Sequence, residues 1–160
     1  MDETMQCAAT GRAGIVAPPP VIYLGVLGVG LLLEWLWPTQ VLTRPLAVVS
    51  GALVLACGAL GLTAAIRTLL RAHTPVDPYK GTTTIVTDGL FRFSRNPIYV
   101  SDVLLYVGLA LLLDSWWALA LSPVVIGVMN VGVIAPEEAY LQRAFGGEYL
   151  RYAQQVRRWL

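Results

Sequence analysis

The sequence predicts an all-α integral membrane protein of one domain, a helical bundle of about four transmembrane helices. Of the 160 residues, 56% are hydrophobic and 13% are charged. The hydrophobic residues stand in long runs almost free of charge, and short charged segments separate these runs. About 20 consecutive apolar residues cross a bilayer as a helix, so this segregation indicates membrane spans rather than a soluble core.

The first two spans follow a polar N-terminal tail of 20 residues, which ends in three prolines and which we expect to be flexible. Val21–Trp37 is long enough to cross at 1.5 Å per residue. Its Gly25, Gly28 and Gly30 are expected to let another helix approach closely, as small residues do in membrane interfaces. Leu46–Ile66 is a second span without a charge, and it has small-residue faces formed by Gly51, Ala52, Ala56, Gly58 and Gly61.

The last two spans, Pro97–Leu113 and Trp116–Ala135, are joined by two residues and should form a C-terminal helical hairpin. Asp102 falls in the first turns of the third helix, where a carboxylate suits the helix N-terminus. Pro136 is expected to break the fourth helix and to start another. Glu148–Leu160 is amphipathic and predicts a cytoplasmic tail helix that lies along the membrane or folds back over the central loop.

Basic residues set the expected orientation. With four spans, both termini and the polar segments 67–99 and 136–160 lie on one side of the membrane. That side carries ten of the eleven Lys and Arg residues, and the other side carries Arg44. Basic loops stay in the cytoplasm, so we expect a multi-pass protein of the cell inner membrane with both termini cytoplasmic.

The candidate site lies where these two polar segments meet. An antiparallel hairpin brings the start of the third helix beside the end of the fourth, so Arg95, Asn96 and Tyr99 should face Glu137 and Glu138. The gap would join cytoplasm to lipid, which suits a water-soluble donor and a lipid-dissolved acceptor. A purely structural interpretation stays open, in which Arg95 pairs with a glutamate and no ligand is bound.

Several site types are not indicated. Cys7 and Cys57 have no metal-ligand or redox spacing, and no Gly-rich phosphate loop is present. His73, the single histidine, is expected to be a surface residue rather than a base. We therefore expect no metal site and no nucleic-acid partner.

Two motifs resemble the isoprenylcysteine carboxyl methyltransferase family, most of all its short bacterial members. The first reads IVTDGLFRFSRNPIY at Ile85–Tyr99. The second, beyond the hairpin, reads EEAYLQRAFGGEYLRYAQQVRRWL at Glu137–Leu160. The resemblance covers roughly Arg67 to the C-terminus. Phospholipid N-methyltransferases and membrane thiol methyltransferases look similar.

The resemblance implies a helical membrane enzyme that uses S-adenosylmethionine and methylates a lipid-soluble or membrane-embedded acceptor among the membrane lipids. It implies first the carboxyl O-methylation of an isoprenylcysteine-like substrate. A phospholipid amine or a small thiol is the alternative acceptor, and a non-catalytic membrane protein of the same fold is a further alternative. A nicotinamide-dependent reductase resembling sterol reductases is a more distant one.

Carried onto this chain, the cofactor contacts fall on residues of both motifs and one residue before them. They are Thr84, Ile85, Val86, Phe91, Asn96, Pro97, Ile98, Tyr99 and Glu137. Because the cofactor is charged, we also expect contacts from Arg95 and Glu138. An arginine can meet the cofactor's carboxylate, and a glutamate can meet its ammonium group.

Three positions depart from the family pattern. Asn96 replaces a histidine that many members carry, and His73 stands where many have glycine. Val133 precedes Glu137 by four residues, where isoprenylcysteine enzymes place an arginine associated with the substrate.

The catalytic residues are not identified by the sequence. A carboxylate acceptor needs no base, because it is already ionised at neutral pH. An amine would need deprotonating, a thiol would react best as thiolate, and the motifs offer no evident histidine for either. The expected contribution of Arg95, Asn96 and Tyr99 is therefore to orient the reactants.

Overall fold

The structure, a computed structural model, describes residues 16–40, 42–75 and 84–160, so most of the predicted N-terminal tail lies outside the described residues. These residues confirm the all-α prediction: they form helices, with a single isolated β-bridge between Ser94 and Arg157. In chain order the elements are α2 (Pro19–Leu36), α3 (Arg44–Arg71), the 3₁₀ helix η1 (Gly89–Arg92), α4 (Pro97–Leu112), α5 (Trp116–Ala120), α6 (Ser122–Met129), the π-helix η2 (Asn130–Ile134), α7 (Ala135–Phe145) and α8 (Gly147–Gln155).

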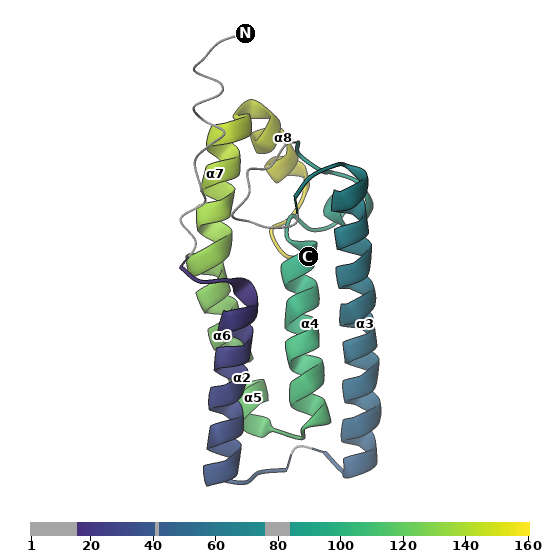
Figure 1. Ribbon diagram of the computed structural model, residues 1–160, viewed down its shortest axis with the longest axis vertical. Coiled ribbons are helices and arrows are strands. Elements are labelled where there is room, and N and C mark those ends of the chain that lie inside the picture. Colours follow the sequence, from purple (N-terminus) through teal and green to yellow (C-terminus); the bar gives the residue numbers. More distant parts are fainter. Residues whose placement is uncertain (1–15, 41, 76–83) are drawn as a thin grey trace.

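The helices form an elongated bundle (Figure 1). α4 packs mainly against α3, while α2 packs against α5 and α6. α5, α6, η2 and α7 follow one another as a single column, and α8 folds back at the end where α4 begins. Pro19 and Pro20, which we expected in the flexible tail, form the first turn of α2, where a missing N–H costs nothing.

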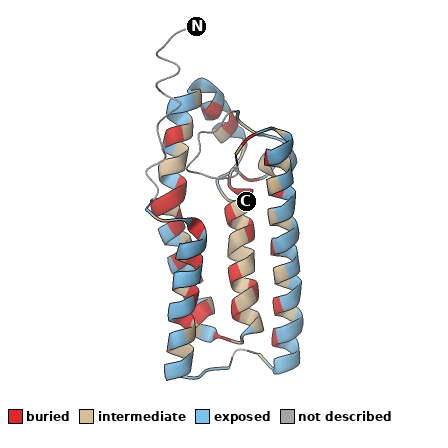
Figure 2. Cartoon of the chain, viewed as in Figure 1, coloured by how far each residue is buried: buried red, intermediate tan, exposed pale blue. Residues whose placement is uncertain are grey.

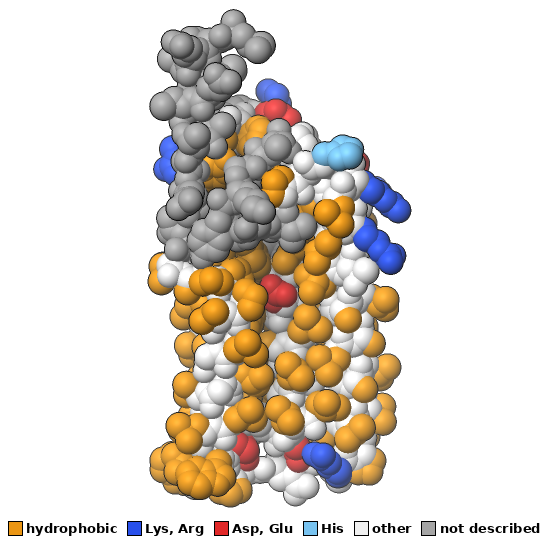
Figure 3. Space-filling model, viewed as in Figure 1, with side chains coloured by type: hydrophobic (Ala, Val, Ile, Leu, Met, Phe, Trp, Pro, Cys, Tyr) orange, Lys and Arg blue, Asp and Glu red, His pale blue; other side chains and the backbone are white. Residues whose placement is uncertain are grey.

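In the described part of the chain, three helical stretches are long and apolar enough to cross a membrane: α2, α3 and the column Trp116–Phe145. α4 is also apolar, but at 16 residues it is shorter. The outer faces carry exposed apolar side chains, such as Leu24 at 64%, Leu53 at 63% and Leu60 at 72% exposure. Figure 2 shows buried residues turned toward the bundle interior, and Figure 3 shows hydrophobic side chains along the bundle with Lys and Arg at its ends. These surfaces match a lipid environment, in which apolar residues need no burial in protein.

Small residues let α3 and α4 approach closely. A Cβ added at Gly51 would lie 2.7 Å from the backbone nitrogen of Leu112, and one at Gly108 would lie 2.7 Å from Cγ of Leu55. Such distances leave no room for a side chain. The prediction of small-residue contacts is thus confirmed for α3.

On α2 the same prediction holds for one glycine of three. A Cβ at Gly30 would lie 2.6 Å from Cα of Ala118, whereas Gly25 and Gly28 have nothing within 4 Å among the described atoms. For Gly25 and Gly28 the prediction of close helix approach within the chain is therefore wrong, because they face away from the other helices.

Replacing Gly51 by leucine is expected to destabilise the bundle by about 1–3 kcal/mol, because α3 and α4 must separate to admit the side chain. The matched variant Gly25→Leu adds the same side chain to open space and should change stability by less than about 0.5 kcal/mol. Unfolding of both proteins in detergent, followed by circular dichroism, measures the difference. Equal losses in the two variants would contradict the packing described.

Pro136 does not break the fourth helix, contrary to the prediction. The column widens at η2, where the N–H of Ala135 donates to the carbonyl oxygen of Asn130, five residues back. A proline in a regular α-helix clashes with the carbonyl four residues earlier, and a π-turn relieves that clash. Glu137 and Glu138 therefore stay in line with the membrane-spanning column instead of starting a separate helix.

The predicted hairpin turn between α4 and α5 is confirmed, and it is fixed by polar contacts. Asp114 has a positive φ of 53°, and its Oδ1 accepts a hydrogen bond from the backbone N–H of Leu42 at 3.1 Å. The Ser115 hydroxyl donates to Oε2 of Glu34 at 3.1 Å and accepts from the N–H of Ala118 at 3.2 Å. Glu34 thus joins the ends of α2 and α5 in a structural role.

Candidate functional site

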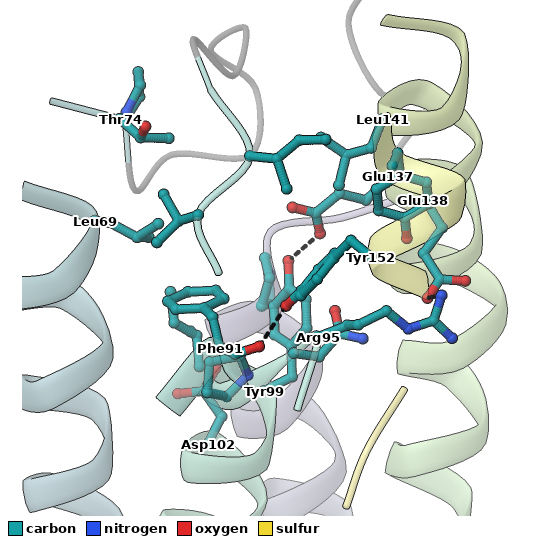
Figure 4. A pocket seen from close by; sticks show the side chains of 18 of the residues that line it. Leu69, Thr74, Phe91, Arg95, Tyr99, Asp102, Glu137, Glu138, Leu141 and Tyr152 are labelled. Carbon is teal, nitrogen blue, oxygen red and sulfur yellow. Dashed lines mark hydrogen bonds and ion pairs between the residues drawn. The ribbon is translucent and has the colours of Figure 1, made fainter. Parts of the chain in front are cut away.

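A cavity of about 360 Å³ lies at the end of the bundle where α4 begins (Figure 4). Its volume falls within the range of small-molecule sites, roughly 300–1,000 Å³. All eleven residues predicted to contact the cofactor line it. Residues that we had not assigned to the site complete the lining: Pro19, Pro20, Leu62, Leu69, Thr74, Pro75, Asp102, Leu141, Tyr149 and Tyr152. Which of them contact a ligand stays a prediction.

The two predicted corners meet across this cavity. The Tyr99 hydroxyl donates to Oε2 of Glu137 at 2.8 Å, and Nη1 of Arg95 lies 3.2 Å from Oε1 of Glu138. α4 begins at Pro97, as expected, and this start turns Tyr99 toward α7. The predicted juxtaposition of these segments is confirmed.

The two glutamates differ in their partners. Glu138 pairs with Arg95 and with Arg158, so its charge is neutralised within the protein. Glu137 bonds to the neutral Tyr99, and no described cationic side chain pairs with it. A cationic ligand would therefore find its counter-charge at Glu137.

The last five residues, Val156–Leu160, form an extended strap across the start of α4, which we call the C-terminal strap. α8 ends at Gln155, so the predicted tail helix over Glu148–Leu160 is wrong for its second half. The backbone N–H of Arg95 donates to the carbonyl oxygen of Arg157 at 2.9 Å. This bond ties the strap to the loop before α4 and favours the extended form.

The strap holds Asn96 and the π-helix as well. Nδ2 of Asn96 donates to the carbonyl oxygen of Arg158 at 3.0 Å, and Nε1 of Trp159 donates to Oδ1 of Asn130 at 3.1 Å. One of the two amide hydrogens of Asn96 is therefore used inside the protein. Its second hydrogen and its acceptor oxygen are left for a ligand.

Two tyrosines of α8 close the cavity from the other side. Tyr149 and Tyr152 are buried, with ring centroids 6.4 Å apart, and the Tyr152 hydroxyl donates to the carbonyl oxygen of Phe91 at 2.7 Å. Burial raises the pKa of both phenols, and the charge of Glu138 adds to the rise at Tyr149. Both stay neutral at physiological pH. Tyr149 and Tyr152 are three residues apart in the second motif, and this spacing places both on the same face of a helix.

Two polar atoms at the cavity lack partners within the described part of the chain. Nε of Arg95 and the hydroxyl of Tyr149 are buried without a hydrogen bond. Leaving a buried donor unsatisfied costs about 1–3 kcal/mol, so a ligand that offers acceptor oxygens at these atoms would be stabilised.

Two departures from the family pattern acquire a structural meaning. His73 has a φ of 52°, the left-handed region in which glycine is favoured, which accounts for the glycine expected at this position. Val133 is fully buried in η2, one turn before Glu137. The position of the expected arginine is thus filled by an apolar core side chain.

Asp102 lies in the second turn of α4, which agrees with the prediction that it falls in the first turns of this helix. It is the sixth residue of the helix and lines the cavity one turn beyond Tyr99 (Figure 4). Within the described ranges, no hydrogen-bond donor and no cation pairs with its carboxylate. Its sequence position resembled a helix-terminal charge, and the three-residue spacing from Tyr99 was the signal that it faces the site.

A family model described as phospholipid methyltransferase matches residues 46–148, more than half of the chain. An uncharacterized protein of Haemophilus influenzae is 46% identical over 63 residues, which cover 35% of this chain and 100% of that protein. A protein-S-isoprenylcysteine O-methyltransferase of Schizosaccharomyces pombe is 33% identical over 72 residues, which cover 45% of this chain and 30% of the yeast protein. No solved structure matches the chain significantly.

Proposed function

Because the chain belongs to the phospholipid methyltransferase family, we propose that it transfers a methyl group from S-adenosylmethionine to a lipid-soluble acceptor. The observation that carries the proposal is the meeting of the Arg95–Tyr99 corner with Glu137 and Glu138 around one cavity. The cavity lies at the arginine-rich end of a bundle whose flanks are apolar. We place this end at the cytoplasmic face of the inner membrane, following the distribution of basic residues.

The donor set of the cavity fits the cofactor, which supplies an electrophilic methyl group on a sulfonium when bound. Glu137 offers the cofactor's positive groups a carboxylate that has no cationic partner in the part of the chain that the structure describes. Nε of Arg95 and the Tyr149 hydroxyl, which make no hydrogen bond of ordinary geometry within the described residues, offer donors to its carboxylate. Ile85 and Phe91 give the cavity apolar surface for an adenine ring.

The protein's contribution to methyl transfer is mainly alignment. Holding two reactants in the geometry of an in-line displacement supplies up to about 7–11 kcal/mol of the barrier. The buried contacts of Tyr99 with Glu137, and of Asn96 with the C-terminal strap, fix the start of α4 against α7 and α8. These contacts hold the walls of the cavity in one arrangement.

Two acceptor classes follow from the comparisons. The name of the yeast relative points to the carboxylate of an isoprenylcysteine, and the family description points to a phospholipid, whose amine is the methylatable group. Incubation of the protein with methyl-labelled cofactor and native membrane extract would identify the molecule that gains the label. A protein that binds no cofactor at high concentration would support the non-catalytic alternative instead.

Replacing Arg95 by glutamine is expected to weaken S-adenosylmethionine binding roughly 10- to 100-fold, since a hydrogen bond to a charged group contributes about 1.5–3 kcal/mol. Arg92→Gln is the matched control. Arg92 is exposed, lies 5.2 Å from the Phe93 ring and does not line this cavity, so the affinity should change less than twofold. Equilibrium dialysis of the three proteins measures both effects, and equal affinities for the two variants would refute the assignment of Arg95.

A further inference from the structure

We propose that Asp102 is the catalytic residue on the acceptor side of the cavity, where its carboxylate binds the ammonium group of a lipid amine and accepts its proton. This inference rests on the proposed methyl transfer and names both the acceptor class and the base. It makes an amine, rather than a carboxylate, the group that is methylated.

Asp102 lies deeper in the bundle than the other charged groups of the cavity. Ser101, its neighbour, meets α3 at Gly61, where an added Cβ would lie 2.7 Å from the serine hydroxyl. Leu62, which also lines the cavity, precedes the end of α3 at Arg71 by nine residues, or about 13 Å of helix rise. Asp102 itself follows the start of α4 at Pro97 by five residues, so it lies in the apolar part of the bundle rather than at its charged end.

The carboxylate of Asp102 is held by no protein donor in the described ranges. It acts electrostatically on the hydroxyls of Tyr23 and Tyr99, but each phenol has one proton, and both protons are already used. Tyr23 donates to the backbone carbonyl oxygen of Tyr99, and Tyr99 donates to Glu137. Ser101 donates to the carbonyl oxygen of Pro97.

An ionisable group within the apolar part of a membrane protein is costly and is usually functional. The acidic residues at the opposite end of the bundle show the contrast. Glu34 accepts hydrogen bonds from Thr39 and Ser115, and Asp114 accepts one from Leu42. Asp102 has no such structural partner in the described ranges and points into the cavity instead (Figure 4).

The charges around the cavity favour a cationic acceptor. α2 and α3 bring only neutral residues to it among those described, and the phenols of α8 are neutral. Arg158, whose side chain is 43% exposed, pairs with Glu138 from outside the lining. Among the described residues that line the cavity, Arg95 balances Glu138, and this leaves the carboxylates of Glu137 and Asp102. S-adenosylmethionine carries one more positive than negative group, so it balances one of the two. An ammonium group on the acceptor would balance the other.

A carboxylate acceptor would be repelled by the negative charges of the cavity. With the cofactor bound, it would bring a second unbalanced negative charge into a poorly solvated cavity, and like charges at such sites strongly disfavour one another. The position where an arginine would offset that charge holds the buried Val133. The structure therefore opposes the isoprenylcysteine-like carboxylate that the resemblance implied.

In the first step, the ammonium group of the acceptor transfers one proton to Asp102. The ammonium N–H bond breaks, its electron pair stays on nitrogen as the nucleophilic lone pair, and the proton bonds to a carboxylate oxygen of Asp102. Burial disfavours both charged partners, so the transfer to a neutral amine and a neutral carboxylic acid is easier here than in water. The lone pair then forms the N–C bond while the C–S bond breaks with its electrons to sulfur, and Asp102 later returns its proton to solvent.

Three probes with one alkyl chain test the binding part without any turnover: hexadecylamine, hexadecanol and hexadecanoate. Native mass spectrometry of the detergent-solubilised protein should show the amine bound at least tenfold more tightly than the alcohol, and the carboxylate least tightly. In Asp102→Asn the preference of amine over alcohol should disappear. Asp88→Asn, which removes an exposed carboxylate outside the cavity, should retain it.

Activity on the amine tests the base. With methyl-labelled cofactor, Asp102→Asn is expected to methylate hexadecylamine about 100-fold more slowly, the usual scale for a general base. Its residual rate should rise about tenfold per pH unit below the amine's pKa, because solvent must then remove the proton. The wild-type rate should depend on pH less steeply. S-adenosylmethionine affinity should change less than threefold in the variant.

Specific outcomes overturn the inference. An amine preference retained in Asp102→Asn, a wild-type preference for hexadecanoate, or a loss of S-adenosylmethionine binding in the variant would each remove Asp102 from the acceptor side. A wild-type protein that binds no S-adenosylmethionine would instead overturn the proposed function, so the two failures are distinguishable.

Discussion

Deletion of the C-terminal strap, Val156–Leu160, is expected to abolish measurable S-adenosylmethionine binding. The strap accepts hydrogen bonds from the backbone of Arg95 and the side chain of Asn96, and it donates one to Asn130 through Trp159. Each such hydrogen bond contributes about 0.5–1.5 kcal/mol, and the deletion removes three of them. The start of α4 then loses its fixed position against α7.

Deletion of Leu160 alone is the matched control, since this residue is 75% exposed. It should retain wild-type affinity in equilibrium dialysis. Circular dichroism of the longer deletion should show the helices of the bundle still formed, because the strap contributes no helix. Undiminished cofactor binding without the strap would show that it does not organise the site.

Replacing Glu137 by alanine is expected to weaken S-adenosylmethionine binding on the order of 1,000-fold. Truncating one partner of a buried, hydrogen-bonded charge pair costs about 2–5 kcal/mol. Glu137 is the carboxylate of α7 that has no cationic partner among the described residues, and the change also removes the acceptor of the Tyr99 hydroxyl. Tyr99→Phe retains the carboxylate, so its loss should stay below about tenfold.

Glu148→Ala serves as the charge-matched control for Glu137. Glu148 is exposed on α8 and does not line the cavity, so its removal should change the affinity less than twofold. Equilibrium dialysis with labelled cofactor measures all three variants. Similar affinities for Glu137→Ala and Glu148→Ala would contradict the proposed role of Glu137 in cofactor binding.

Much of the site was predictable because its residues are contiguous in two short motifs. The start of α4 at Pro97 follows from local chemistry, and the hairpin then required Tyr99 to approach Glu137. The continuation of the helix through Pro136 could not be predicted from local sequence in the same way. A proline inside a helix usually kinks or breaks it. Here the helical column continues through Pro136 because the turn that begins at Asn130 is widened.

The sequence by itself determined the membrane bundle, its helical hairpin and the two segments that carry the site, because hydrophobic run length and motif order are local properties. The tertiary structure alone decided how the charges are partnered. It paired Glu138 with two arginines, left Glu137 to a tyrosine 38 residues away, and turned Asp102 into the cavity without a partner in the described ranges. Such pairings depend on distances between segments far apart in the chain, and no local pattern encodes those distances.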